Sequence, residues 1–102
     1  MAKYLVLMAP GPALPAPTQV SQAAESAKSW VAEQKQNGRL DVAYTYPQGG
    51  GCAIFNVGSS EELQELLARN PGHAYVQYTV YPLVEFDEGI DRLSQGREYA
   101  EQ

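Results

Sequence analysis

The sequence contains one cysteine, Cys52, and one histidine, His73. A single cysteine excludes an internal disulfide, and one histidine without neighbouring acidic residues is not enough for a metal site. No apolar run approaches the ~20 residues that a membrane-spanning helix needs, and no signal-peptide cleavage pattern follows the first residues. The glycine run at 49–51 has no helix after it, so no phosphate-binding loop is predicted. We therefore expect a cytoplasmic protein with no metal or other cofactor and no membrane partner.

Basic residues are also scarce: 7 Lys and Arg stand against 12 Asp and Glu, which gives a formal net charge of −5. An acidic protein repels phosphate backbones, which argues against nucleic acid as a partner. The length of 102 residues allows one domain of ordinary size. Because most of the acidic excess lies from Glu85 onward, we divide the chain into a domain at residues 1–84 and an acidic tail at 85–102. The tail is predicted to hold a short helix around Ile90 and Leu93.

The first half of the chain predicts a strand, a loop and a helix. The apolar run at residues 3–9 is typical of a central strand. Four prolines in the segment Pro10–Pro17 argue against helix and sheet pairing there, so we expect a loop. Thr18 offers an N-cap for a helix with apolar residues at helical spacing, and Asn37-Gly38 provides the left-handed residue that ends it.

The second half predicts a hairpin, a second helix and a final strand. Residues 40–46 alternate in polarity as a half-buried strand does, and residues 52–57 form another strand after a glycine-rich turn. Ser59 and Glu62 have the spacing of a capping box, which begins the second helix. A long strand is expected from His73 to about residue 84.

This order of elements, β-α-β-β-α-β, predicts the ferredoxin-like α+β fold. In that fold both helices cover one face of a four-stranded antiparallel sheet. An apolar sheet face without cover is an association surface. We therefore expect a homodimer, or a higher homo-oligomer, in which two open faces enclose a cavity.

Several segments follow the pattern of a known family. They are the helix end with Glu33 and Asn37-Gly38, the passage Ile54–Leu63, the run Leu66–Pro71, and the final strand Ala74–Leu83. From about Lys28 to Leu83 the chain resembles muconolactone isomerase and its relatives, which are small dimeric α/β barrels. The resemblance implies the ferredoxin-like fold, a dimeric barrel and isomerase-like chemistry. At the family's basic and aromatic positions in the second strand this chain has Val42, Tyr44 and Thr45, so no basic anchor for a carboxylate is expected in the strands.

Strand parity divides the last strand into two sets. Val76, Tyr78 and Val80 form the more apolar set, which we expect beneath the helices. The other set faces the cavity and, with residues of the second and third strands, is predicted to bind the substrate. The predicted substrate-binding residues are Tyr44, Tyr46, Asn56, Gln77, Thr79 and Tyr81.

Two further residues of the cavity-facing set are candidates for catalysis. Imidazole titrates near neutrality, so His73 is either a surface-loop histidine or a general base or acid at the cavity mouth. The hydroxyl of Tyr75 is predicted to stabilise negative charge on an enolate-like oxygen. The seven tyrosines as a set favour an apolar, aromatic or polyketide-like small molecule as the ligand.

Two classes of function remain open. The first is an isomerase or cyclase that acts by proton transfer on such a molecule, with a cofactor-free monooxygenase of the same superfamily as a variant. The second is a dimer that binds a small molecule without turning it over, for example in a stress response. His73 and the tyrosines favour the enzyme, whereas the lack of an acid–base pair at clear spacing favours the binding protein.

Overall fold

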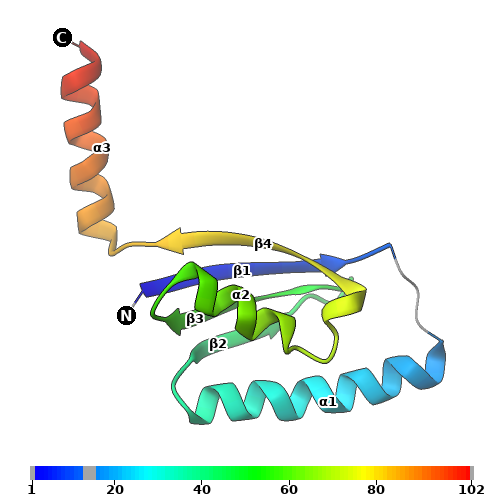
Figure 1. The fold of residues 1–102 in the computed structure, drawn as a ribbon. Helices are drawn as coiled ribbons and strands as arrows, with labels where there is room; N and C mark the ends of the chain where they lie inside the picture. The colour runs from blue at the N-terminus through cyan, green and yellow to red at the C-terminus, as the bar shows by residue number, and fades with distance from the viewer. Residues whose placement is uncertain (1, 13–15, 102) are drawn as a thin grey trace.

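The computed structural model describes residues 2–12 and 16–101, with residues 96–101 described by their backbone alone. A four-stranded sheet has the order β2-β3-β1-β4, and all neighbouring strands are antiparallel. This is the ferredoxin-like arrangement that the sequence predicts, and the prediction is confirmed (Figure 1). In chain order the elements are β1 (Ala2–Pro10), α1 (Pro17–Gln36), β2 (Leu40–Thr45), β3 (Gly51–Val57), α2 (Ser60–Ala68), the 3₁₀ turn η1 (His73–Tyr75), β4 (Val76–Leu83) and α3 (Phe86–Glu101).

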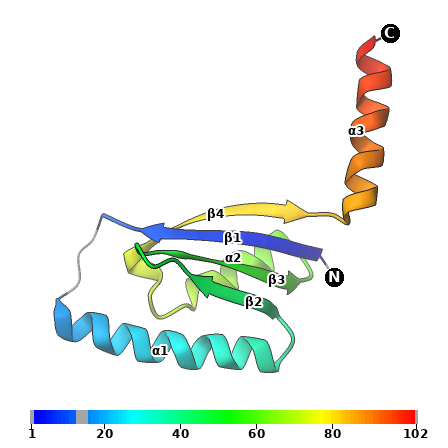
Figure 2. The same cartoon turned by 180° about the vertical axis from the view of Figure 1, so that it is seen from behind.

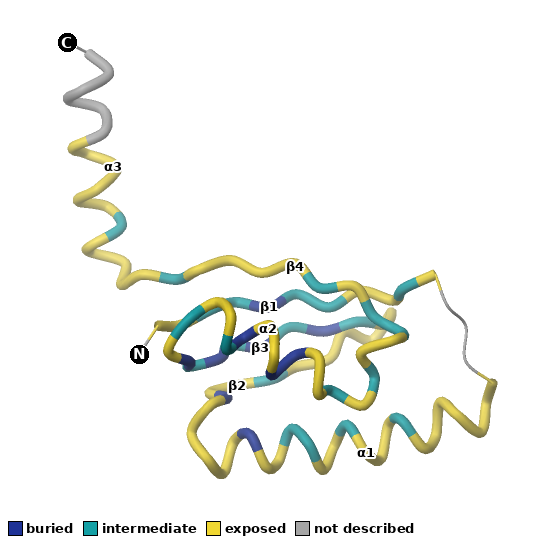
Figure 3. The backbone as a smooth tube through the Cα atoms, in the orientation of Figure 1, coloured by how far each residue is buried: buried dark blue, intermediate teal, exposed yellow. Residues whose placement is uncertain are grey.

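The core lies between the sheet and α2. Val6 of β1, Phe55 and Val57 of β3, and Leu63 of α2 are the largest fully buried side chains. The ring of Trp30 from α1 packs at a tilt against Phe55, with ring centroids 6.2 Å apart. Figure 3 shows that the buried residues are concentrated in β3 and α2, whereas α1 is exposed over most of its surface. The opposite face of the sheet carries no helix (Figure 2).

The ends of the helices follow local signals in the sequence, with one exception. Gly38 has φ +83° and ends α1, as predicted. Ser59 caps α2 by accepting a hydrogen bond from the Glu62 amide at 3.2 Å, which is also as predicted. The prediction that Thr18 caps α1 is wrong, because α1 begins at Pro17 and the residue at the N-cap position is Ala16. Proline is favourable at this first helical position, where its missing N–H has no intrahelical partner to lose.

The proline-rich segment is shorter than predicted. Pro10 belongs to β1 and lies opposite Val76, and Pro17 is helical, so the loop covers only the residues between them. Of that loop, residues 13–15 lie outside the described part. A third proline, Pro82, lies within β4. It is tolerated because β4 is an edge strand and has no neighbour on its outer side.

The last strand also begins later than predicted, at Val76 rather than His73. The His73 amide donates to the Asn70 carbonyl at 2.9 Å, and the Tyr75 amide donates to the Gly72 carbonyl at 2.9 Å. These hydrogen bonds wind residues 73–75 into η1, so strand parity does not apply to them.

The acidic tail forms one 16-residue helix, α3, which is longer than the short helix expected. It leaves the body beyond the β4 edge and points away from the sheet (Figures 1 and 2). Among the helices that the structure describes, none is long and apolar enough to span a bilayer.

Candidate functional site

The face of the sheet that carries no helix, called the open face below, is apolar at its centre. Val6 is buried beneath the helices, so its neighbours Leu5 and Leu7 lie on the open face. Leu5 lies opposite Ile54 of β3 and Tyr81 of β4, which places those side chains on the same face. By the same register, the face also carries Val42, Tyr44, Cys52, Asn56, Gln77, Thr79 and Leu83.

A polar network lies at one end of this apolar surface. Lys3 Nζ donates a hydrogen bond to Asn56 Oδ1 at 2.8 Å and a second one to the Asp41 carboxylate. The Asn56 amide donates to the other oxygen of Asp41. The three side chains come from β1, β2 and β3, and each contacts the other two. An ammonium group has three donors, so Lys3 keeps one N–H for a ligand.

The backbone explains why these side chains meet. Lys3 lies directly opposite Asn56 in the β1–β3 register. Between Leu40 and Val42 the β2–β3 register shifts by one residue, which is the pattern of a β-bulge. A bulge places an extra residue against one partner and redirects its side chain. Asp41 is that extra residue, and its carboxylate reaches the open face.

This network corrects one inference from the sequence. No basic anchor was expected in the strands, but Lys3 belongs to β1 and faces the open side of the sheet. Alternation along residues 3–9 could have revealed Lys3, because it shares parity with Leu5 and Leu7. Asp41 could not be found in this way, since regular alternation puts it on the opposite face from Val42.

A hollow of about 440 Å³ lies beside Lys3, where β1 begins and β4 passes into α3. Small-molecule sites have volumes of ~300–1,000 Å³, so the hollow has the size of a ligand site. Lys3 therefore lies between the apolar surface and a space that a small molecule can enter. The lining residues are Ala2, Lys3, Leu83, Val84, Glu85, Phe86 and Glu88.

Most of the predicted substrate-binding residues share the open face. The register places Tyr44, Asn56, Gln77, Thr79 and Tyr81 there, and the predicted division of β4 into two faces agrees with it. Their roles in binding remain predictions, except that Asn56 is now placed in the network with Lys3.

Tyr46 follows β2 in the hairpin, at the end of the open face opposite to Lys3. Loss of hydration raises the pKa of its hydroxyl, and the neighbouring Cys52 thiol raises the pKa further. Tyr46 therefore keeps its proton over the whole neutral range and can act as a hydrogen-bond donor. Cys52 itself faces the open side of β3, because it lies opposite Leu7 of β1.

The two predicted catalytic residues lie elsewhere. The His73 ring stacks on Tyr78, with centroids 5.8 Å apart and planes at 26°. Tyr78 packs against the core on the helix-covered face, and its hydroxyl accepts a hydrogen bond from Asn70 at 2.9 Å. Burial raises the pKa of Tyr78, and the bond from Asn70 partly opposes this shift. The structure therefore places His73 beside the helix layer, and η1 holds Tyr75 outside the strand register.

Within the described residues, no group of three His, Cys, Asp or Glu side chains could hold a metal ion. The charged groups of the open face are instead Lys3 and Asp41, which are paired with each other. In such a pair, the ammonium group can stabilise negative charge on a ligand oxygen. The carboxylate can accept a proton from a ligand carbon.

Comparisons with known proteins agree with this fold. The structure is similar to the crystal structure of a muconolactone isomerase, with a TM-score of 0.73 and 20% identity, over 81% of this chain and 88% of that chain. It is also similar to 5-chloro-2-hydroxyhydroquinone dehydrochlorinase from Burkholderia phenoliruptrix in complex with 2,5-dihydroxybenzoquinone, with a TM-score of 0.63 and 11% identity, over 84% of this chain and 97% of that chain. Curated protein sequences gave no significant match. The family model of muconolactone delta-isomerase matches residues 3–88, from β1 through β4 into α3. The resemblance predicted from the sequence is thereby confirmed, and the chain belongs to the muconolactone delta-isomerase family.

Proposed function

We propose that the protein is a small-molecule isomerase that moves a proton within a carbonyl-bearing ligand held against the open face. The observation that supports this best is the network of Lys3, Asp41 and Asn56 at the end of an otherwise apolar sheet face. It supplies a proton acceptor and a cationic donor side by side, in a chain whose family is named for an isomerase.

The chemistry that fits this network is a proton shift through an enolate. The Asp41 carboxylate takes a proton from a carbon next to a carbonyl group, and the electron pair of the broken C–H bond moves toward the carbonyl oxygen. The remaining N–H of Lys3 donates to that oxygen and stabilises its negative charge. Asp41 then returns the proton to another carbon of the conjugated system. The ligand leaves as an isomer, and the protein is unchanged.

Asn56 serves this chemistry by fixing the two charged groups. Its side-chain oxygen accepts from Lys3 while its amide donates to Asp41, so the ammonium and the carboxylate are held in one orientation. A group held in place before the reaction needs no reorganisation when charge develops, which is the main source of electrostatic catalysis.

The cavity for this reaction is proposed to form between two copies of the chain. The open face is too apolar to remain exposed, and packing two such faces together gives a homodimer with an enclosed space. Tyr44, Gln77, Thr79 and Tyr81 would then contact the body of the ligand. The names of the two structural neighbours, a lactone isomerase and a protein in complex with a quinone, favour a small oxygenated ring as the substrate class.

The proton-transfer roles predicted for His73 and Tyr75 stay predictions. The structure favours the Lys3 network over them, because His73 stacks on a residue of the helix-covered face and Tyr75 lies in a 3₁₀ turn.

A non-catalytic binding protein is the second candidate, and one observation favours it. Lys3 and Asp41 already neutralise each other and are hydrogen-bonded to Asn56. Such a pair could orient a polar ligand without exchanging a proton with it.

The test is solvent proton exchange into muconolactone in ²H₂O, followed by ¹H NMR. The proposal expects the wild type to incorporate deuterium and to form the isomer, with Lys3→Met slower by ~10²–10³-fold, which is the cost of losing one oxyanion donor. Lys28→Met is the matched control, because Lys28 lies on α1 and pairs with the exposed Glu25 at 3.4 Å, its one ion-pair partner among the described side chains. Binding of muconolactone without exchange would support the binding protein and overturn the isomerase.

A further inference from the structure

The hollow beside Lys3 is lined by more acidic than basic groups. Glu85 and Glu88 line it together with Lys3, and its other lining residues are uncharged. Lys3 comes from the start of β1, and the two glutamates come from the passage of β4 into α3, which lies beside that start (Figures 1 and 2). A ligand that enters the hollow therefore meets two carboxylates and one ammonium group.

The ammonium group is already shared with a carboxylate. Lys3 forms an ion pair with Asp41 on the open face. Glu88 pairs with Arg92 at 2.7 Å, whereas Glu85 forms no ion pair with the described side chains. At neutral pH the two basic groups oppose three carboxylates, which leaves one negative charge in excess around the hollow.

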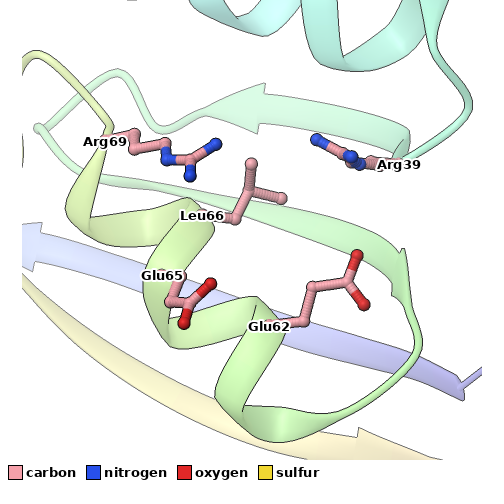
Figure 4. Close-up of a pocket in the computed structure, with 5 residues that line it drawn as sticks. All are labelled: Arg39, Glu62, Glu65, Leu66 and Arg69. Carbon is pink, nitrogen blue, oxygen red and sulfur yellow. The ribbon is translucent and has the colours of Figure 1, made fainter.

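The other basic side chains that the structure describes belong to the helix layer. Lys28 and Lys35 are residues of α1. Arg39 and Arg69 line a separate groove beside α2, on the helix-covered side of the sheet (Figure 4). Among the described residues, Lys3 is therefore the one basic side chain of the open face.

A second copy packed on the open face does not change this balance. A two-fold interface repeats the same surface, so each copy brings one Lys3–Asp41 pair. The basic side chains of the helix layer stay behind each sheet. Within the described part of the chain, the enclosed space then offers no unpaired cation to a ligand carboxylate.

The proposed proton transfer keeps the charges balanced only when the ligand is neutral. Before the transfer, Lys3 and Asp41 cancel each other. Once Asp41 has accepted the proton it is uncharged, and the positive charge of Lys3 is then balanced by the enolate oxygen. A ligand that also carries a carboxylate adds one uncompensated negative charge at every step, and a charge that leaves water without a partner is unfavourable.

We propose that the site selects uncharged cyclic carbonyl compounds, and that Glu85 and Glu88 weaken the binding of compounds that carry a carboxylate. The proposal rests on the proposed function, because it names the substrate class of the same site. Lys3 keeps one N–H for the carbonyl oxygen of a neutral ligand, whereas the two glutamates repel a second oxygen anion.

Muconolactone and its methyl ester test the proposal, because they share one ring and differ by one negative charge at neutral pH. The dissociation constants of both ligands are measured with the full chain by ligand-observed ¹H NMR at low salt. The ester should bind ~5–10-fold more tightly, which is the effect of two like charges that are open to water. Added salt should narrow this ratio, since it screens exposed charges.

The double variant Glu85→Gln/Glu88→Gln removes both charges and keeps the size of the side chains. It should bind muconolactone ~5-fold more tightly than the wild type does and the ester within ~2-fold of the wild type. The double variant Glu25→Gln/Glu33→Gln is the matched control, because Glu25 pairs with Lys28 as Glu88 does with Arg92, and Glu33, like Glu85, forms no ion pair with the described side chains. The control should keep both dissociation constants within ~2-fold of the wild type, and circular dichroism shows that each variant is folded.

Equal binding of the two ligands by the wild type, or failure of the ester to bind, would overturn the proposal. It would also be overturned if the hollow variant bound muconolactone no better than the wild type, or if the control improved this binding equally. Deuterium exchange into both ligands is followed in the same samples. Tighter binding of the ester without exchange into either ligand would support the charge selection and overturn the isomerase, whereas exchange with equal binding would do the reverse.

Discussion

Substitution of Gly50 by alanine tests how closely the turn between β2 and β3 packs against the backbone of β1. Gly50 has φ +86°, and a Cβ placed there would lie 2.4 Å from the carbonyl oxygen of Met8. The left-handed conformation costs an alanine ~1–2 kcal/mol. The clash adds to this cost because Met8 is backbone of β1, which is paired with both β3 and β4 and cannot move without disturbing their hydrogen bonds. One or two weakened backbone hydrogen bonds contribute ~1 kcal/mol each.

Gly50→Ala should therefore lower the free energy of unfolding by about 3 kcal/mol. Gly38→Ala is a matched control, because Gly38 has nearly the same φ, +83°, but no atom within 4 Å of the added Cβ. It should cost only the conformational term, about 1 kcal/mol. Urea unfolding at one fixed protein concentration, followed by Trp30 fluorescence, gives both values. Equal losses at the two glycines would refute the close approach of this turn to β1.

The other two predictions on stability concern the core and the hydroxyl of the half-buried Tyr78. Leu63→Ala should lower the free energy of unfolding by ~2–5 kcal/mol, because Leu63 is 1% exposed at the centre of the core. A decrease of less than ~1 kcal/mol in urea unfolding would show that α2 does not pack against the sheet as described. Burial raises the pKa of Tyr78, so the folded chain keeps that proton at a pH where the unfolded chain has lost it. Stability should consequently fall as the pH rises through ~10, and fall less in Tyr78→Phe; parallel pH dependence of the urea midpoints in the two proteins would contradict this.

The fold could be predicted because its signals are local and agree with one another. The Ser59 cap, the Gly38 stop and the strand at residues 52–57 after its glycine-rich turn each depend on a few neighbouring residues, and all three appear in the structure. The error in the start of β4 arises because a local hydrogen bond competes with strand pairing. The sequence of residues 73–75 predicts a strand, but the His73 amide donates a hydrogen bond to the Asn70 carbonyl, which forms a turn instead.

The candidate site was harder to predict because it depends on strand pairing. Strand parity alone places Lys3 on the open face, whereas Asp41 reaches that face only through the register shift in β2. Parity did place Gln77, Thr79 and Tyr81 correctly, since β4 is regular from Val76 onward. Parity does not support a cavity-facing His73, because residues 73–75 form η1 and a residue outside the strand has no face fixed by alternation.

We propose that Asp41 moves the proton, that Lys3 stabilises the enolate oxygen, and that His73 takes no part in the transfer. The most direct measurement compares solvent deuterium exchange into muconolactone by Asp41→Asn and by His73→Ala, at the same pH and protein concentration. Asparagine keeps the shape of the side chain but cannot accept the proton, so Asp41→Asn should exchange ~10²–10⁴-fold more slowly than the wild type. His73→Ala should stay within ~3-fold of the wild type, because His73 stacks on Tyr78 away from the open face. Full exchange by Asp41→Asn together with its loss in His73→Ala would exclude Asp41 as the base and place the catalytic base at His73.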